Sequence, residues 1–191
     1  MGIRSRSALH TFEYVVRGQG RRKGDRAMAF LRVNLTKLKT MVVDDSRTAR
    51  LMLAEMLREM GVSSIAKAED GADAMQQLQE FAADVVICDL HMTPLDGIEF
   101  TRLLRTADDS PNPYLPVLML TGDATQKQLG NALNAGAHGF MSKPLQADSL
   151  RRQINLVFSR PLVFIREGRE LKPVTLPKRQ DDGDVQCASA A

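Results

Sequence analysis

The stretch Val85-Val86-Ile87-Cys88-Asp89 decides how this chain folds, because four apolar residues in succession end abruptly on a carboxylate. A short apolar run rich in β-branched residues predicts a strand that is buried on both faces of a sheet. Comparable runs stand at 41–43, 117–120 and 139–142, and a polar or charged residue follows each of them. We therefore expect each polar group to lie where a buried strand emerges.

Amphipathic stretches separate the apolar runs between residues 38 and 159, and five of these stretches read as helices. A further short strand is expected at 63–66. This alternation is typical of a parallel sheet covered by helices on both faces, so the sequence predicts an α/β, doubly wound fold with five parallel strands. The expected helices are 47–60, 72–81, 98–106, 125–135 and 148–158.

The first expected helix carries its apolar residues largely on one broad side, which we expect to face the sheet. The third expected helix presents Ile98, Phe100, Thr101, Leu103 and Leu104, and the last includes Leu150, Ile154, Leu156, Val157 and Phe158. The inner side of the first helix comprises Leu51, Leu53, Ala54, Met56, Leu57 and Met60.

The two ends of the chain differ from its centre in charge. Residues 1–40 carry ten Lys and Arg against two acids, whereas residues 41–191 carry sixteen against twenty-one. A chain of 191 residues with 43% hydrophobic content can bury one good core. We expect a flexible basic N-terminal extension over 1–37, one domain over 38–159, and a partly disordered C-terminal tail over 160–191, in which the apolar patch 162–165 is a candidate for docking back on the domain.

Composition also bounds the compartment and the partners. No apolar stretch approaches the roughly 20 residues that span a bilayer, so no membrane insertion is expected. The two cysteines, Cys88 and Cys187, do not suggest a disulfide framework, and we expect a soluble, cytoplasmic protein. Most basic runs are solvated tails, so no nucleic-acid partner is expected for the front of the chain. Composition does not separate a transit peptide from a misassigned start there.

Three carboxylates are expected to converge at one edge of the sheet. Ligands of open parallel sheets bind at the carboxyl ends of the strands where the strand order reverses, and Asp44, Asp45 and Asp89 follow neighbouring strands there. Clustered carboxylates repel one another unless a cation neutralises them, and Mg²⁺ prefers oxygen ligands of this kind. Zn²⁺ would recruit His91 or Cys88, but strand alternation places Cys88 in the core and His91 reads as a loop residue.

Two further residues suit a phosphate. Lys143 supplies a positive charge, and Thr121 supplies a hydroxyl that can donate to a phosphoryl oxygen. A carboxylate beside Mg²⁺ and a lysine can itself be a nucleophile that forms an acyl phosphate. Asp89 is the best candidate because it is the single central carboxylate, while Asp44 and Asp45 share the metal.

The order and spacing of these residues resemble the receiver domain of bacterial two-component response regulators. The resemblance covers residues 38–159 and is carried by Asp44-Asp45, by Asp89 in the stretch 89–97, by Thr121 and by Lys143-Pro144. It implies a flavodoxin-like sheet with the strand order 2-1-3-4-5. It also implies that Asp89 is the phosphoacceptor and that Lys143 pairs with the phosphorylated site. It also implies a cis peptide between Lys143 and Pro144.

The same resemblance assigns the metal ligands and the switch. Mg²⁺ would be held by Asp45, Asp89 and the backbone carbonyl of His91, with Asp44 acting through water. Thr121 would move toward the phosphoryl group, and Phe140 occupies the aromatic switch position. A core aromatic is the alternative for Phe140.

Some positions depart from the family pattern. Pro94 stands one place later in the loop after Asp89 than is usual, and Gly122 replaces a common alanine. The positions of His91 and Asp123 flank the path of attacking water in this family, so the resemblance implies that they tune the lifetime of the acyl phosphate.

The function implied is that of a stand-alone response regulator. A sensor histidine kinase or a histidine phosphotransfer protein would donate the phosphoryl group, and contacts around the fourth helix, the fifth strand and the fifth helix would signal to an unknown downstream protein. No conventional enzymatic activity is expected beyond self-phosphorylation and autodephosphorylation at Asp89. Two alternatives stay open. A haloacid-dehalogenase-like phosphatase needs an acid where His91 stands, and a degenerate receiver used only as an interaction module would have lost an acid, Thr121 or Lys143.

Overall fold

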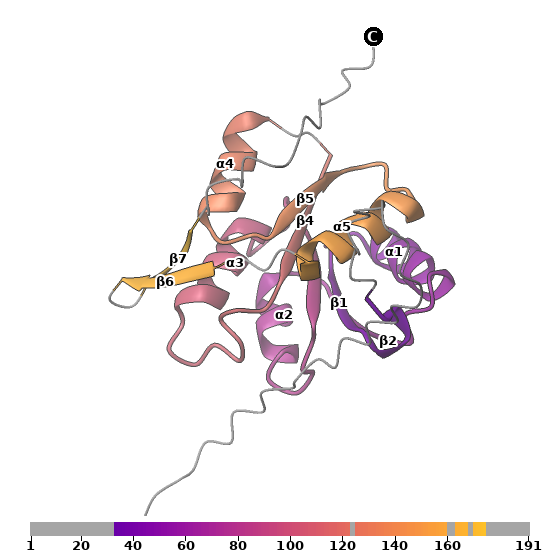
Figure 1. Cartoon of the computed structure of the whole chain (residues 1–191), viewed down its shortest axis with the longest axis horizontal. Helices are drawn as coiled ribbons and strands as arrows, with labels where there is room; N and C mark the ends of the chain where they lie inside the picture. Colours follow the sequence, from indigo (N-terminus) through magenta and orange to yellow (C-terminus); the bar gives the residue numbers. More distant parts are fainter. Residues whose placement is uncertain (1–32, 123–124, 160–162, 168–169, 175–191) are drawn as a thin grey trace, which may run out of the picture.

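A central sheet of five parallel strands organises the protein in its computed structural model (Figure 1). The structure describes residues 33–122, 125–159, 163–167 and 170–174. The strand order is β2-β1-β3-β4-β5, which confirms the predicted topology. The strands are β1 Lys39–Val43, β2 Ser64–Ala68, β3 Val85–Asp89, β4 Val117–Thr121 and β5 Gly139–Ser142. The helices are α1 Arg47–Glu59, α2 Gly71–Gln77, α3 Gly97–Thr106, α4 Gln126–Asn134 and α5 Ala147–Ser159.

The two faces of the sheet carry separate apolar cores. Every residue of β3 and of β4 is buried, as expected for strands covered on both sides. Side chains alternate between the faces, so Val86 and Cys88 lie in the core that includes Phe100 of α3, whereas Val85 and Ile87 lie in the core that includes α1 and α5. The prediction that Cys88 is a core residue is confirmed, since it is fully buried.

Three apolar residues that the helical patterns group with buried neighbours are exposed. Leu51 is 45% exposed, Leu103 is 41% exposed and Leu156 is 37% exposed, so the expected inner sides were drawn too wide. The second helix is also shorter than the expected 72–81. It ends at Gln77, and the amides of Gln79 and Glu80 bond the carbonyls three residues back, at Gln76 and Gln77, so the regular α-helical pattern is broken there.

A close approach of backbones fixes the segment that follows β3. The amide of Gly97, the first residue of α3, donates to the Leu90 carbonyl at 3.1 Å. A Cβ atom at position 97 would collide with the backbone carbonyl oxygen of Asp89. Only glycine therefore lets α3 begin directly beneath the end of β3. This contact holds the loop between Asp89 and α3 close to the site.

Ordered elements extend beyond the expected limits of the domain. A short 3-10 helix, η1 Leu35–Lys37, precedes β1, and Leu35 is only 7% exposed. At the other end, β6 Val163–Glu167 and β7 Glu170–Val174 form an antiparallel pair, which the sequence did not predict. This hairpin lies against α3 and α4 (Figure 1). Within the candidate patch 162–165, Phe164 contacts Tyr114 and His138, Ile165 is exposed, and residue 162 lies outside the described residues.

The remaining expectations for the ends fall outside the described residues. These are the flexibility of the basic extension up to residue 32 and the disorder expected from residue 180 onward. None of the helices in the described ranges combines the length and apolar character that a membrane span requires.

Candidate functional site

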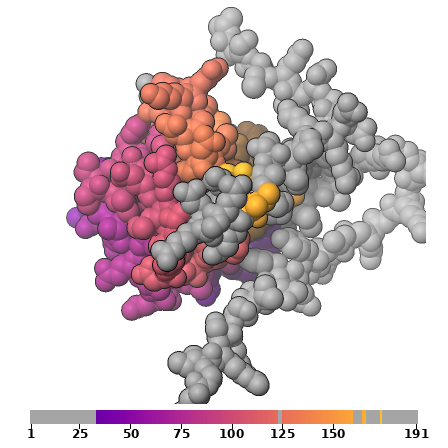
Figure 2. All heavy atoms as spheres, turned by 90° about the vertical axis from the view of Figure 1, so that its left-hand side faces the viewer, coloured from indigo at the N-terminus to yellow at the C-terminus, as the bar shows by residue number. Residues whose placement is uncertain are grey.

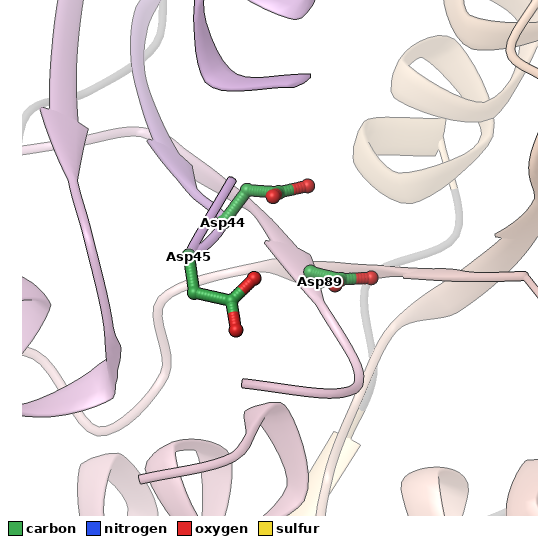
Figure 3. A group of neighbouring side chains, drawn as sticks. All are labelled: Asp44, Asp45 and Asp89. Atoms are coloured by element: carbon green, nitrogen blue, oxygen red, sulfur yellow. The ribbon is translucent and has the colours of Figure 1, made fainter. Parts of the chain in front are cut away.

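The three predicted acids meet at the carboxyl edge of the sheet. Asp44 and Asp45 follow β1 directly, and Asp89 is the last residue of β3, the strand beside it. One carboxylate oxygen from each residue lies within 4.8 Å of the others. Figure 3 shows the three side chains side by side between the ends of the two strands. The structure therefore brings together the acidic cluster that the sequence predicts.

Lys143, which directly follows β5, supplies a cation to this cluster. Its Nζ lies 2.9 Å from Oδ2 of Asp44 and 3.0 Å from Oδ1 of Asp89. The backbone amide of Lys143 donates to the Thr121 carbonyl at 2.7 Å, which anchors the end of β5 beside β4. Burial alone would lower the pKa of Lys143, but the hydrogen bonds to the two carboxylates outweigh it and raise that pKa. Lys143 therefore stays charged between Asp44 and Asp89.

Burial dominates the chemistry of Asp89. The residue is only 8% exposed, and loss of hydration raises the pKa of its carboxyl group even though Lys143 acts in the opposite direction. A carboxylate with a raised pKa is more basic than an exposed one. The Asp89 oxygens also accept fewer hydrogen bonds from water than an exposed carboxylate would. This weaker hydration favours attack of the carboxylate on an electrophile.

The donor set fits a hard divalent cation. Asp44 already uses Oδ1 to accept the Ser46 amide at 2.9 Å and Oδ2 to accept Lys143. Asp45 is exposed, and only one oxygen of Asp89 is paired with Lys143. Asp45 and Asp89 thus have oxygens available as direct ligands, and three carboxylates with one lysine leave net negative charge for Mg²⁺.

The softer alternative to Mg²⁺ does not fit. Cys88 is fully buried in the core that contains Phe100, and burial raises the pKa of its thiol well above the ordinary value. Within the described residues its sulfur is not among the clustered ligand atoms, which are carboxylate oxygens of Asp44, Asp45 and Asp89, so the geometry gives no support to a zinc site built from Cys88 and His91. The role of the His91 backbone carbonyl as a metal ligand stays a prediction.

The His91 side chain has a partner that the sequence did not predict. Its Nε2 lies 3.1 Å from Nε2 of Gln128 in α4. Gln128 uses its other side-chain atom, Oε1, to accept the Thr125 amide at 3.2 Å in the capping box at the start of α4. A Thr-x-x-Gln spacing signals such a cap in a sequence, but the contact with His91 spans 37 residues and has no local signal. One side chain therefore joins the loop after Asp89 to α4.

Arg50 is a second residue that the sequence reasoning missed. Its guanidinium donates to the backbone carbonyl of Asp44 from the first turns of α1. The helix itself begins directly after the acids, because the Ser46 side chain caps the Ala49 amide. The position of Asp44 is thus fixed from both its side chain and its backbone.

The two predicted switch residues lie next to the site. Thr121 is the last residue of β4 and is only 2% exposed. Phe140 lies in β5 opposite Met119 and is partly buried against the core that contains Phe100. The Lys143–Pro144 peptide is cis, as the resemblance implies, and Thr93–Pro94 is cis as well. A switching role for Thr121 and Phe140 stays a prediction.

Known proteins resemble the central part of the chain. The family model of the response regulator receiver domain matches residues 40–155. The chemotaxis protein CheY of Pseudomonas aeruginosa is 34% identical over 123 residues, which cover 64% of this chain and 98% of that protein. The chemotaxis protein CheY-3 of Vibrio cholerae is 32% identical over 123 residues, which cover 64% of this chain and 93% of that protein.

Solved structures agree with this assignment. The chemotaxis response regulator CheY4 of Vibrio cholerae is 30% identical with a TM-score of 0.57, and the match covers 63% of this chain and 98% of that one. The receiver domain of the Francisella response regulator 1452 is 24% identical with a TM-score of 0.57, over 64% of this chain and 97% of that one, and supports the fold alone. The hairpin lies beyond the residues that match the family model.

Proposed function

The chain belongs to the response regulator receiver family, and we propose that Asp89 accepts a phosphoryl group from a phosphohistidine of a partner protein. The observation that carries the proposal is the pairing of one lysine with two of three clustered acids. Lys143 lies within 3.0 Å of both Asp44 and Asp89, while the oxygens of all three acids lie within 4.8 Å of one another.

The transfer would proceed by direct attack. A carboxylate oxygen of Asp89 attacks phosphorus, a new O–P bond forms, and the N–P bond of the donor phosphohistidine breaks, which leaves a free imidazole on the donor. Neutralising the phosphoryl oxygens is the chemistry that a bound Mg²⁺ supplies here. Lys143 can shift from the Asp89 carboxylate to a phosphoryl oxygen, and hydrolysis by water returns the carboxylate and inorganic phosphate.

The metal would be held chiefly by Asp45 and Asp89. The two side-chain oxygens of Asp44 already accept bonds from Ser46 and Lys143, which supports a role for Asp44 through water. The backbone carbonyl of His91 is the further ligand that we propose. Each of these donors is an oxygen atom, as Mg²⁺ prefers.

Signalling would follow from a change around Thr121 and Phe140. Thr121 ends β4 immediately before the segment that leads to α4, so a hydroxyl drawn toward the phosphoryl group would pull on that segment. We propose that the resulting change near α4, β5 and α5 is read by a downstream protein. The signalling unit is the domain over 38–159, and the protein acts in the cytoplasm.

A sensor histidine kinase or a histidine phosphotransfer protein is the proposed donor. Helix α1 begins two residues after Asp45 and exposes Leu51 and Met52, which is 68% exposed. Exposed apolar side chains beside a reaction site are suited to docking a protein donor. A degenerate receiver that acts without phosphorylation finds no support in a site that retains its acids, Thr121 and Lys143 together.

Intact-protein mass spectrometry tests the proposal. After incubation with acetyl phosphate and Mg²⁺, the full chain is expected to gain the mass of one phosphoryl group, and the gain should disappear with EDTA. Asp89→Asn removes the nucleophile but keeps a side chain of similar size, so it should fold and gain no mass. If acetyl phosphate gives no mass gain and a panel of phosphorylated histidine kinases gives none either, the degenerate alternative becomes the better reading.

A further inference from the structure

The hairpin formed by β6 and β7 places one aromatic ring on the domain. Phe164 lies with its ring 5.1 Å from the guanidinium carbon of Arg105, a cation–π contact. Its ring centroid is 6.0 Å from that of Tyr114 in an edge-on arrangement and 5.8 Å from that of His138. The fit is close, because a Cβ atom added at Gly136 would lie 3.2 Å from the Phe164 ring. We call Arg105, Tyr114, Gly136 and His138 the hairpin site.

The hairpin site offers an aromatic ring a buried guanidinium, from Arg105, and a partly buried imidazole, from His138. Arg105 is 2% exposed and donates to the backbone carbonyls of Pro113, Leu115 and Gly136 at 2.8–2.9 Å. His138 is held neutral, because burial and the nearby Arg105 lower its pKa to about 3. A buried guanidinium that is solvated by carbonyls still gains from the electron-rich face of a ring. Phe164 supplies that face.

Helix α4 connects the hairpin site to the acidic site. Just beyond its C-terminal end, after the C-cap Ala135, Gly136 carries a carbonyl that accepts a hydrogen bond from Arg105. At its N-terminal end, Gln128 reaches His91 in the loop after Asp89. The strand β7 lies along α4 as well as α3, and Figure 2 shows the yellow hairpin atoms against the orange atoms of α4. Helix α4 therefore meets the hairpin site at its C-terminal end and the loop after Asp89 at its N-terminal end.

Helix α4 is also weakly held to the rest of the domain. Of its residues, all of which are described, Ala132 alone is buried. Gly130 stands in its interior, where glycine costs about 1 kcal/mol relative to alanine. Elements with few buried side chains are the ones that move at low cost. Contacts from the hairpin therefore make a large relative contribution to the position of α4.

We propose that the hairpin site is a binding surface for residues 163–174 of the same chain, and that the bound hairpin braces α4 and opposes phosphorylation of Asp89. The inference rests on the proposed function. The docked hairpin belongs to the arrangement in which Lys143 pairs with the carboxylate of Asp89 itself. Phosphorylation would move Lys143 from the Asp89 carboxylate to a phosphoryl oxygen and would draw Thr121, which precedes α4, toward the phosphoryl group. The docked hairpin resists the resulting movement of α4 and so disfavours phosphorylation.

Coupling of this kind is reciprocal. If docking of the hairpin disfavours the phosphorylated arrangement, phosphorylation weakens docking by the same factor. Because the family model ends at residue 155, the brace is an addition to the shared domain of this chain. A downstream protein that captured the released hairpin, or the surface that it leaves, would favour phosphorylation in turn.

The test uses the full chain and three variants. Phe164→Ala removes the docked ring. Tyr114→Ala removes the exposed side chain that contacts this ring from the domain. Ile165→Ala is the matched control, because Ile165 lies in the same strand and is 52% exposed. Two quantities are measured. One is hydrogen exchange in peptides that cover 163–174, with and without Mg²⁺ and beryllium fluoride as the phosphoryl mimic. The other is the rate of phosphorylation by acetyl phosphate, followed by intact mass.

The proposal predicts that beryllium fluoride speeds hairpin exchange in the wild type by at least about fivefold. Phe164→Ala and Tyr114→Ala should speed exchange without the mimic and should speed phosphorylation by at least about fivefold, whereas Ile165→Ala should do neither. Faster exchange in Phe164→Ala with an unchanged phosphorylation rate would overturn the coupling. Unchanged exchange in Phe164→Ala would overturn docking itself. If the wild type gains no phosphoryl mass from acetyl phosphate or from phosphorylated histidine kinases, the proposed function fails, and the exchange of Phe164→Ala still decides whether the hairpin docks through its ring.

Discussion

Lys143 gives the sharpest test of how the acidic site is balanced. Replacing it with glutamine shortens the side chain by one atom, keeps a polar end, and removes the charge that now lies 2.9 Å from Asp44 and 3.0 Å from Asp89. Hydrogen bonds to charged groups contribute about 1.5–3 kcal/mol each when buried. Lys143 keeps 32% of its side chain exposed, so solvent screening removes about half of that contribution. We expect Lys143→Gln to lower the free energy of unfolding by about 2 kcal/mol in magnesium-free buffer.

Magnesium should reverse most of this loss. The destabilisation arises because three clustered carboxylates lose their cation, and a divalent ion bound to them restores positive charge at the same place. The gap between Lys143→Gln and the wild type should therefore shrink to below about 1 kcal/mol in Mg²⁺. Urea unfolding in EDTA and in millimolar MgCl₂ measures both values.

Lys39→Gln is the matched control for this comparison. Lys39 is exposed at the opposite end of β1, so its replacement should change the stability little in either buffer. An equal loss for Lys143→Gln in EDTA and in Mg²⁺ would refute the reasoning, because it would show that Lys143 does not share its carboxylates with a metal. No loss in either buffer would refute the contribution of the two ion pairs.

Three further predictions follow from single positions. Gly97→Ala should lower the free energy of unfolding, measured in urea, by at least about 2 kcal/mol, because its Cβ would meet the Asp89 carbonyl. Gly130→Ala, which has open space around its Cβ, should raise the free energy of unfolding by about 0.5–1 kcal/mol. A similar effect at both positions would contradict the close approach of Gly97 to the Asp89 carbonyl. His138 has a folded pKa of about 3, which lies below its unfolded pKa. As the pH drops from about 6.5, the unfolded state therefore binds a proton that the folded state does not, and the free energy of unfolding should fall by at most about 2 kcal/mol at pH 5. His138→Asn should lose that part of the acid sensitivity, and equal acid sensitivity in the wild type and the variant would contradict the prediction. Met52→Glu should slow phosphotransfer from a protein donor by about tenfold and leave acetyl phosphate reactivity unchanged; equal slowing with both donors would place Met52 in the chemistry and not in docking.

The sequence predicted most reliably what depends on local pattern. The five strands, their parallel direction and the position of Asp44, Asp45 and Asp89 at the carboxyl edge of the sheet follow from short apolar runs that end on polar residues. Strand alternation also placed Cys88 in the core. These features depend only on neighbours in the chain and on the common geometry of parallel sheets, so they can be inferred without knowing any long-range contact.

Helix faces were predicted less well. Helical periodicity marks the middle of an apolar side but not its width, and Leu51, Leu103 and Leu156 lie at the margins where no second layer covers them. The width of the buried stripe depends on how much of each helix the sheet and its neighbours cover. That extent is a property of the assembled domain.

The contacts around the hairpin could not be predicted from the sequence. Arg105 is a charged residue on an amphipathic helix, and its burial depends on carbonyls up to 31 residues away and on a ring that lies beyond the domain. The contact between His91 and Gln128 likewise joins a loop to a helix across the site. Such contacts need the fold to exist before they can be recognised.

The central claim is that Asp89 itself carries the phosphoryl group, and its most direct test is chemical mapping of the modified residue. The wild type is phosphorylated with acetyl phosphate and Mg²⁺, reduced with borohydride, digested and sequenced by mass spectrometry. Borohydride converts an aspartyl phosphate to homoserine, so homoserine is expected at position 89, and Asp44 and Asp45 should remain aspartate. Homoserine at either of those two positions, with Asp89 intact, would contradict the account.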